Sequence, residues 1–168
     1  PVARRRLQLG FLALTEADYN KAERLFKAAT AGDWPLAAWL GAARAAAGLG
    51  DTERAHEHLE QARGCEGGVL PAALQAARMD HAAGELGRAR RRLEELADQH
   101  PDHPERVRLL CEILEREADW DALARVLPRL DDDRDPALAR LQRRLWLALL
   151  RRAGRRADVK KAYVTLEE

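Results

Sequence analysis

The chain has few cysteines, few aromatic residues, almost no net charge and no long hydrophobic run. Its 168 residues include two cysteines, Cys65 and Cys111, and no CxxC pair or zinc-type spacing, which argues against a disulfide-stapled secreted module and a structural metal site. The 29 basic and 28 acidic side chains nearly cancel, so composition gives no reason to expect a nucleic-acid partner. No run approaches the roughly 18 apolar residues that cross a bilayer.

Signatures of common enzyme classes are also missing. The sequence contains no GxSxG, GxxxxGK[ST], GxGxxG or HExxH motif. The pair Gly67–Gly68 has no strand before it, so we expect a linker there and not a phosphate-binding loop. We therefore predict that the chain is not an enzyme, and its start at Pro1 suggests a piece of a longer protein.

An internal repeat of about 34 residues is present instead. Four segments align without gaps: EADYNKAERLF, GDTERAHEHL, GELGRARRRL and ADWDALARVL. Each has a small or apolar residue followed four positions later by a large apolar one, and these pairs are Ala22 and Phe26, Ala55 and Leu59, Ala89 and Leu93, and Leu123 and Leu127. A small residue lets two helices cross closely, and the larger residue fills the remaining groove.

This pattern resembles the tetratricopeptide repeat (TPR). The upstream half-repeats carry the family's apolar-then-small pair at Leu9–Gly10, Ala42–Ala43, Ala76–Ala77 and Leu110–Cys111. The resemblance implies an all-α fold, a right-handed superhelix of antiparallel helix hairpins with about ten helices in a single domain, 1–168. The expected repeats are 2–33, 34–67, 68–102, 103–134 and a degenerate fifth, 135–168.

Caps and helix breakers predict where the helices begin and end. Aspartates and prolines mark starts, and glycines mark ends. The expected spans are 2–14, 18–31, 34–48, 51–64, 69–83, 86–99, 103–117, 120–130, 135–153 and 156–167. No strand pattern occurs.

In the TPR family the first helices of the hairpins line a concave groove suited to a partner's peptide or helix. By repeat phase, the candidate partner-binding residues are Leu40, Arg44, Leu74, Arg78, His81 and Arg108. Arg44 and Arg78 lie one repeat apart and could pair with acidic side chains of a partner. The alternative is that both are ordinary solvated charges.

The histidines and cysteines are read as structural or solvated in most cases. His56 and His58 are two residues apart and diverge on a helix, so we expect surface positions and no metal. Cys111 occupies the small core position, and Cys65 falls in a linker. His81 lies on the side that lines the groove in the TPR family and could contact a ligand.

A narrower resemblance is to the HemY family, and it covers almost the full length. It is carried by an arginine-rich entry, LGFLALTEADYNKAERLFKAA, AAWLGAARAAAGLGDTERAHEHLEQA, HPDHPERVRLLCEILEREADWDALARVLPRL and RLQRRLWLALL. The resemblance implies a longer parent anchored in the bacterial inner membrane upstream of residue 1, a repeat domain on the cytoplasmic side, and an association with late haem biosynthesis.

From these resemblances we expect a non-catalytic scaffold that binds protein partners, which could include haem-pathway enzymes. No metal or cofactor is required. Two alternatives remain open. One is a haem or porphyrin carrier, with His81 as an axial ligand and Arg78 near a propionate, and the other is a TPR adaptor in envelope or lipopolysaccharide assembly.

Overall fold

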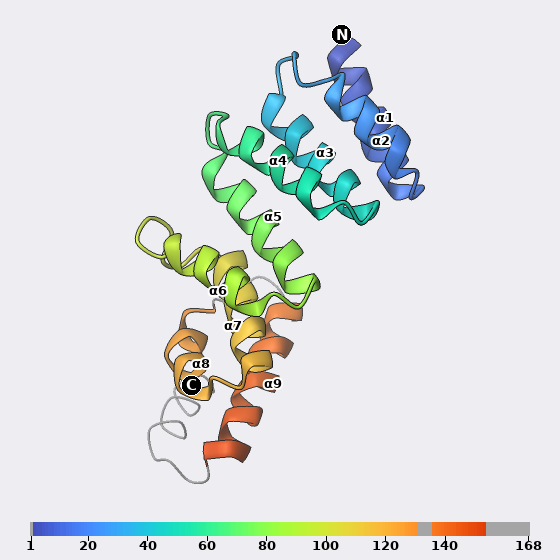
Figure 1. Ribbon diagram of the computed structural model, residues 1–168. Coiled ribbons are helices and arrows are strands. Elements are labelled where there is room, and N and C mark those ends of the chain that lie inside the picture. Colours follow the sequence, from blue (N-terminus) through green and yellow to red (C-terminus); the bar gives the residue numbers. More distant parts are fainter. Residues whose placement is uncertain (1, 131–135, 154–168) are drawn as a thin grey trace. The chain divides into compact units, whose positions relative to one another are not determined.

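The computed structural model describes residues 2–130 and 136–153, and in this part of the chain helices are joined by turns and no strand occurs (Figure 1). The predicted all-α class is confirmed. The helices are α1 (Val2–Thr15), α2 (Tyr19–Lys27), α3 (Pro35–Gly48), α4 (Thr52–Arg63), α5 (Val69–Ala82), α6 (Leu86–Glu95), α7 (Pro104–Glu117), α8 (Trp120–Val126), a 3-10 helix η1 (Leu127–Arg129) and α9 (Pro136–Ala153). The helix expected over 156–167 lies outside the described residues.

The chain divides into two compact units, unit 1 (Pro1–Gly84) and unit 2 (Glu85–Glu168). Unit 1 holds α1 to α5, in which α1 packs on α2 and α3 on α4, and unit 2 holds α6 to α9, in which α7 packs on both α6 and α8. A single repeat domain over the whole chain stays a prediction.

The turn before each second helix has the same backbone form in all four described hairpins. The residue in the left-handed region, with φ from 57° to 83°, falls at repeat-equivalent positions, and these are Ala17, Gly50, Gly84 and Ala118. The next residue is Asp18, Asp51 or Asp119 in three hairpins, and its carboxylate accepts the N–H of the residue three positions on at 3.0–3.1 Å. A left-handed residue followed by a capping aspartate therefore starts these helices.

The small-and-large pairs of the repeat are buried, as the sequence predicts. The four small or apolar positions Ala22, Ala55, Ala89 and Leu123 are fully buried, and their partners Phe26, Leu59, Leu93 and Leu127 are at most 3% exposed. Around Phe26 the core includes Ala13, Ala42 and Ala45, and around Leu59 it includes Ala43, Ala62, Ala72 and Ala76. Phe26 thus joins α2 to α3, the first helix of the following hairpin, and Leu59 joins α4 to α5 in the same way.

Three helices end earlier than the sequence predicts. In the span 86–99, helix α6 stops at Glu95, because the N–H of Ala97 bonds the carbonyl of Glu94 and the carbonyl of Leu93 accepts Arg106 instead. In the span 120–130, the α-helix ends at Val126 and η1 begins at Leu127, because the next residue, Pro128, has no N–H to donate. In the span 18–31, α2 ends at Lys27 and a turn follows.

Candidate functional site

A cavity of about 440 Å³ in unit 2 is lined by residues of α7 and α9. We call it the α7–α9 groove. Its lining residues are Pro104, Glu105, Arg108 and Glu112 from α7 and Ala137, Leu138 and Leu141 from α9. One wall is therefore charged and the other apolar. Helix α7 is the first helix of its hairpin, the type of helix predicted to line a binding groove.

The charged wall is held by ion pairs within α7. Arg108 Nη2 lies 3.5 Å from Glu105 Oε1, and Arg108 Nη1 lies 3.3 Å from Glu112 Oε1. The three side chains keep between 26% and 37% of their surface exposed. Such i,i+3 and i,i+4 pairs contribute only about 0.3–0.5 kcal/mol each, so a partner's charged group can replace them at small cost.

Unit 1 holds the other predicted binding residues. Arg44 on α3 and Arg78 on α5 are both exposed, at equivalent positions of successive repeats. Leu40 is half-buried against the core around Leu59, and its carbonyl accepts Gln75 Nε2 from α5 at 3.0 Å. That bond ties α5 to α3.

The remaining two predicted residues in unit 1 are less accessible. Leu74 is only 5% exposed and belongs to the core, so its side chain offers a partner little surface. His81 is half-buried near the end of α5. The structure thus places Leu40, Arg44, Leu74, Arg78 and His81 in unit 1 and Arg108 in the α7–α9 groove of unit 2.

The prediction that His58 is a surface residue is wrong. His58 is buried, with Nε2 2.9 Å from Glu23 Oε1 and its ring centroid 5.6 Å from that of Trp39. Arg54 Nη1 contacts the other oxygen of Glu23 at 3.2 Å. The spacing of the two histidines predicts that His56 and His58 point in different directions. It does not predict that a buried carboxylate of α2 contacts His58. The sequence feature that could have predicted this contact is the placement of Glu23 and the basic residues Arg54 and His58 about one repeat apart, on successive second helices.

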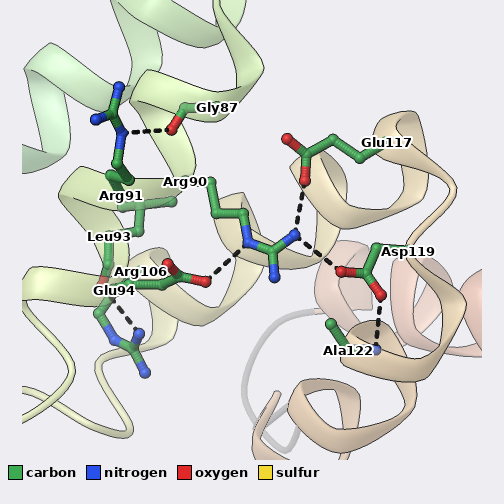
Figure 2. Close-up of polar contacts among 9 residues, drawn as sticks. All are labelled: Gly87, Arg90, Arg91, Leu93, Glu94, Arg106, Glu117, Asp119 and Ala122. Atoms are coloured by element: carbon green, nitrogen blue, oxygen red, sulfur yellow. Dashed lines mark hydrogen bonds and ion pairs between the residues drawn. The ribbon is translucent and has the colours of Figure 1, made fainter.

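A second set of polar contacts joins the helices of unit 2 (Figure 2), and the sequence analysis did not predict it. Arg90 on α6 contacts Glu94 through Nε at 2.8 Å, and its Nη1 contacts Glu117 at 3.0 Å and Asp119 at 2.8 Å. The N–H of Ala122, and then Arg90, hold the pKa of Asp119 below its usual range. These contacts fix the α7–α8 turn, so we assign them to structure and not to binding.

Arg106 has a similar structural role. It is 2% exposed and donates to the carbonyl oxygens of His100 at 2.9 Å, Leu93 at 3.1 Å, and Pro101. Burial lowers its pKa. The guanidinium thereby satisfies carbonyls at the end of α6 and in the link to α7.

In the described ranges, 2–130 and 136–153, no cluster of three or more histidine, cysteine, aspartate or glutamate side chains is arranged to hold a metal ion. Within the same ranges, no helix combines the length and apolar character needed to cross a membrane.

Comparison with known proteins gives one set of similar sequences. No family model matches the chain. It is 32% identical over 163 residues to Protein HemY of Escherichia coli K12, and the same values hold for Protein HemY of Escherichia coli O157:H7 and of Shigella flexneri. The matched region covers 93% of this chain and 40% of each relative, so the chain spans well under half the length of these proteins.

Proposed function

We propose that this HemY-like chain is a non-catalytic helical-repeat scaffold that holds a segment of a partner protein in the α7–α9 groove and serves haem biosynthesis at the bacterial inner membrane. The similarity to proteins named HemY supports the haem association. The α7–α9 groove, with its charged and apolar walls, is the observation that carries the binding role.

The groove lining defines what it can bind. Leu138 and Leu141 can bury one or two apolar side chains of a partner segment. Across the cavity, Glu105 and Glu112 outnumber Arg108, so a basic group beside those apolar side chains is favoured. Because the walls are preformed helices, only the partner segment loses conformational freedom on binding.

Unit 1 supplies a second contact in this proposal. Arg44 and Arg78 are exposed guanidinium groups one repeat apart, and they can donate charge-assisted, two-pronged hydrogen bonds to acidic side chains of a partner. Enzymes of the haem pathway are the proposed partners.

The test is affinity capture from a bacterial membrane extract with the whole chain as bait, quantified by mass spectrometry. The variant Leu138→Asp places a charge on the apolar wall of the groove. Leu147→Asp is the matched control, because Leu147 is on the same helix, is 45% exposed and does not line the cavity. We expect haem-pathway enzymes to be captured by the unmodified chain and the control, and lost from the groove variant.

A double variant, Arg44→Ala with Arg78→Ala, tests the second contact. Capture should weaken without loss of helicity, since both side chains are exposed. Equal capture by the Leu138 and Leu147 variants would refute the groove, and recovery of envelope proteins without haem-pathway enzymes would refute the haem association.

A further inference from the structure

A small cavity with a mostly basic lining lies on α6. Its volume is about 180 Å³, and its lining residues are Arg88, Arg91, Arg92 and Glu95. We call it the α6 cavity. All four side chains come from two turns of one helix, on a side away from the fully buried Ala89 and Leu93. None of them takes part in the proposed function, so the α6 cavity is a separate site.

The charges around the α6 cavity are not used in the way that the other arginine of this helix is. Arg90 contacts Glu117 and Asp119, and Figure 2 shows Arg91 pointing away from both. The Nε of Arg91 donates to the carbonyl of Gly87 at 3.4 Å, which leaves its two terminal nitrogens for another acceptor. A Cβ atom at Gly87 would meet no atom within 4 Å, so the surface beside Arg91 is open.

The side chains of Arg88 and Glu95 make no hydrogen bond or ion pair with the described residues. Both are exposed, and they lie on the same side of α6, two turns apart. The α6 cavity thus separates an arginine from a glutamate that it does not contact. A ligand that carries both a negative and a positive group would satisfy each of them.

Comparison with α4 shows that this arrangement departs from the repeat. Arg88 corresponds to Arg54, which pairs with Asp51 of the preceding turn and with Glu23 of α2. The counterpart of Asp51 is Glu85, whose side chain makes no cap hydrogen bond with α6. Among the described second helices, α6 alone has an arginine at all three phases that line the cavity. The contacts that neutralise this position in unit 1 are therefore missing in α6.

The composition of the lining indicates which ligand fits. Three guanidinium groups and one carboxylate give the α6 cavity a net charge of +2. A phosphomonoester carries about −1.5 to −2 charges at pH 7, whereas a single carboxylate carries one. The planar fork of a guanidinium group also matches two phosphate oxygens at once. A compact group with two negative charges is therefore favoured over a single carboxylate.

We propose that the α6 cavity binds the phosphate group of a phosphomonoester that has an amino group beside the phosphate. Arg88 and Arg91 donate hydrogen bonds to the phosphate oxygens, and Arg92 adds positive charge. Glu95 accepts a hydrogen bond from the amino group, which removes the repulsion between its carboxylate and the phosphate. The same chemistry occurs in free metabolites and in lipid headgroups, and the test distinguishes these two sources.

The test is isothermal titration calorimetry of the whole chain with O-phosphoethanolamine, at a constant ionic strength of about 0.1 M. We expect saturable binding with a Kd of about 1 mM or lower, and the double variant Arg88→Gln/Arg91→Gln should weaken it about tenfold or more. The matched control is Arg140→Gln/Arg143→Gln, which removes two exposed arginines from α9 and should bind as the unmodified chain does. Circular dichroism checks that the variants remain helical.

Two related ligands test the two halves of the proposal. Ethanolamine O-sulfate has the same shape and one negative charge fewer, so it should bind several-fold more weakly than O-phosphoethanolamine. Ethyl phosphate lacks the amino group and should also bind several-fold more weakly. Glu95→Gln should remove the difference between O-phosphoethanolamine and ethyl phosphate, because the carboxylate that accepts from the amino group is gone.

Cosedimentation with phosphatidylcholine vesicles that contain phosphatidate identifies the source of the phosphate group. Binding that Arg88→Gln/Arg91→Gln abolishes would assign a lipid headgroup, and binding of the soluble ligand alone would assign a free phosphomonoester. No saturable binding of either kind, with the soluble ligand raised to about 10 mM, would overturn the proposal. Equal weakening by the α9 control variant, or equal affinity for the phosphate and sulfate esters, would also overturn it.

Discussion

Phe26 is packed so closely against two glycines that adding a methyl group to either should destabilise the chain. A Cβ atom at Gly41 would lie 2.5–2.6 Å from three ring carbons of Phe26, and one at Gly10 would lie 2.8–3.0 Å from the same carbons. The ring cannot easily move away, because it is fully buried and Phe11 packs edge-on against it with centroids 5.0 Å apart.

The magnitude for Gly41→Ala follows from two opposing effects. Overpacking a tight core costs about 1–3 kcal/mol, and the better helix propensity of alanine returns about 0.5–1 kcal/mol. We expect a net loss of about 1–2 kcal/mol in the free energy of unfolding. For a chain of this length that loss lowers the melting temperature by about 3–6 °C.

Gly87→Ala is the matched control. Gly87 is also within a helix, but a Cβ atom there would meet no atom within 4 Å. Only the propensity effect remains, so this variant should be more stable by about 0.5–1 kcal/mol. Urea unfolding followed by circular dichroism measures both variants. The two substitutions therefore have opposite expected signs.

A double-mutant cycle identifies Phe26 as the cause. The next hairpin has Leu59 in place of Phe26 and Ala43 in place of Gly10, which indicates that the smaller side chain accommodates alanine. Gly41→Ala should cost about 1 kcal/mol less in a Phe26→Leu background than in the unmodified chain. If Gly41→Ala is stabilising, or if its cost is the same in both backgrounds, the packing argument fails.

Further substitutions test other contacts. Arg106→Met leaves buried carbonyls unpaired and should lower the free energy of unfolding by about 2–4 kcal/mol in urea titrations. Ala118→Gly relieves a left-handed alanine with φ 57° and should raise the melting temperature by a few degrees, for about 0.5–1 kcal/mol. Burial raises the pKa of Cys111 to about 12, so a maleimide at pH 8 should label it only after unfolding. The hydrogen bond from the N–H of Ala122 lowers the pKa of Asp119 on folding. The ionised Asp119 therefore stabilises the folded chain above the unfolded pKa of about 3.9, and this stabilisation is lost as pH falls through the folded pKa. Asp119→Asn should reduce the difference between the urea midpoints measured at pH 7 and pH 3.

The repeat could be predicted from sequence because each hairpin has the same kind of turn and the same kind of contact between neighbouring helices. Gly50 and Asp51 form one turn with a left-handed residue and a cap, and the span predicted to follow them, 51–64, differs from α4 by one residue at each end. The small-and-large pairs were visible for the same reason, since Ala55 and Leu59 repeat one contact between neighbouring helices. The residues that form the turn and the residues that let the helices cross closely are therefore only a few positions apart in the sequence.

The groove was only partly predictable, because the repeat period fails where α9 begins. Arg108 does line the cavity, but the residue one period later, Gln142, is 3% exposed and donates to the carbonyl of Leu130 at 2.8 Å. Leu138 and Leu141 line the cavity in its place. The register of α9 is set by this packing and not by the 34-residue spacing, so sequence phase alone cannot assign the apolar wall.

Whether a charged residue has a structural role or is free to bind a partner depends on whether another helix covers it. Arg5 and Arg106 are the same residue type at the same repeat phase, yet the first is exposed and the second is buried against three carbonyl oxygens. Their sequence surroundings do not separate them, because the carbonyls that bind Arg106 come from the preceding helix and link. Helix propensity and apolar periodicity can therefore specify these repeats, while the division of their arginines into structural and binding groups requires knowing which helix packs on each face.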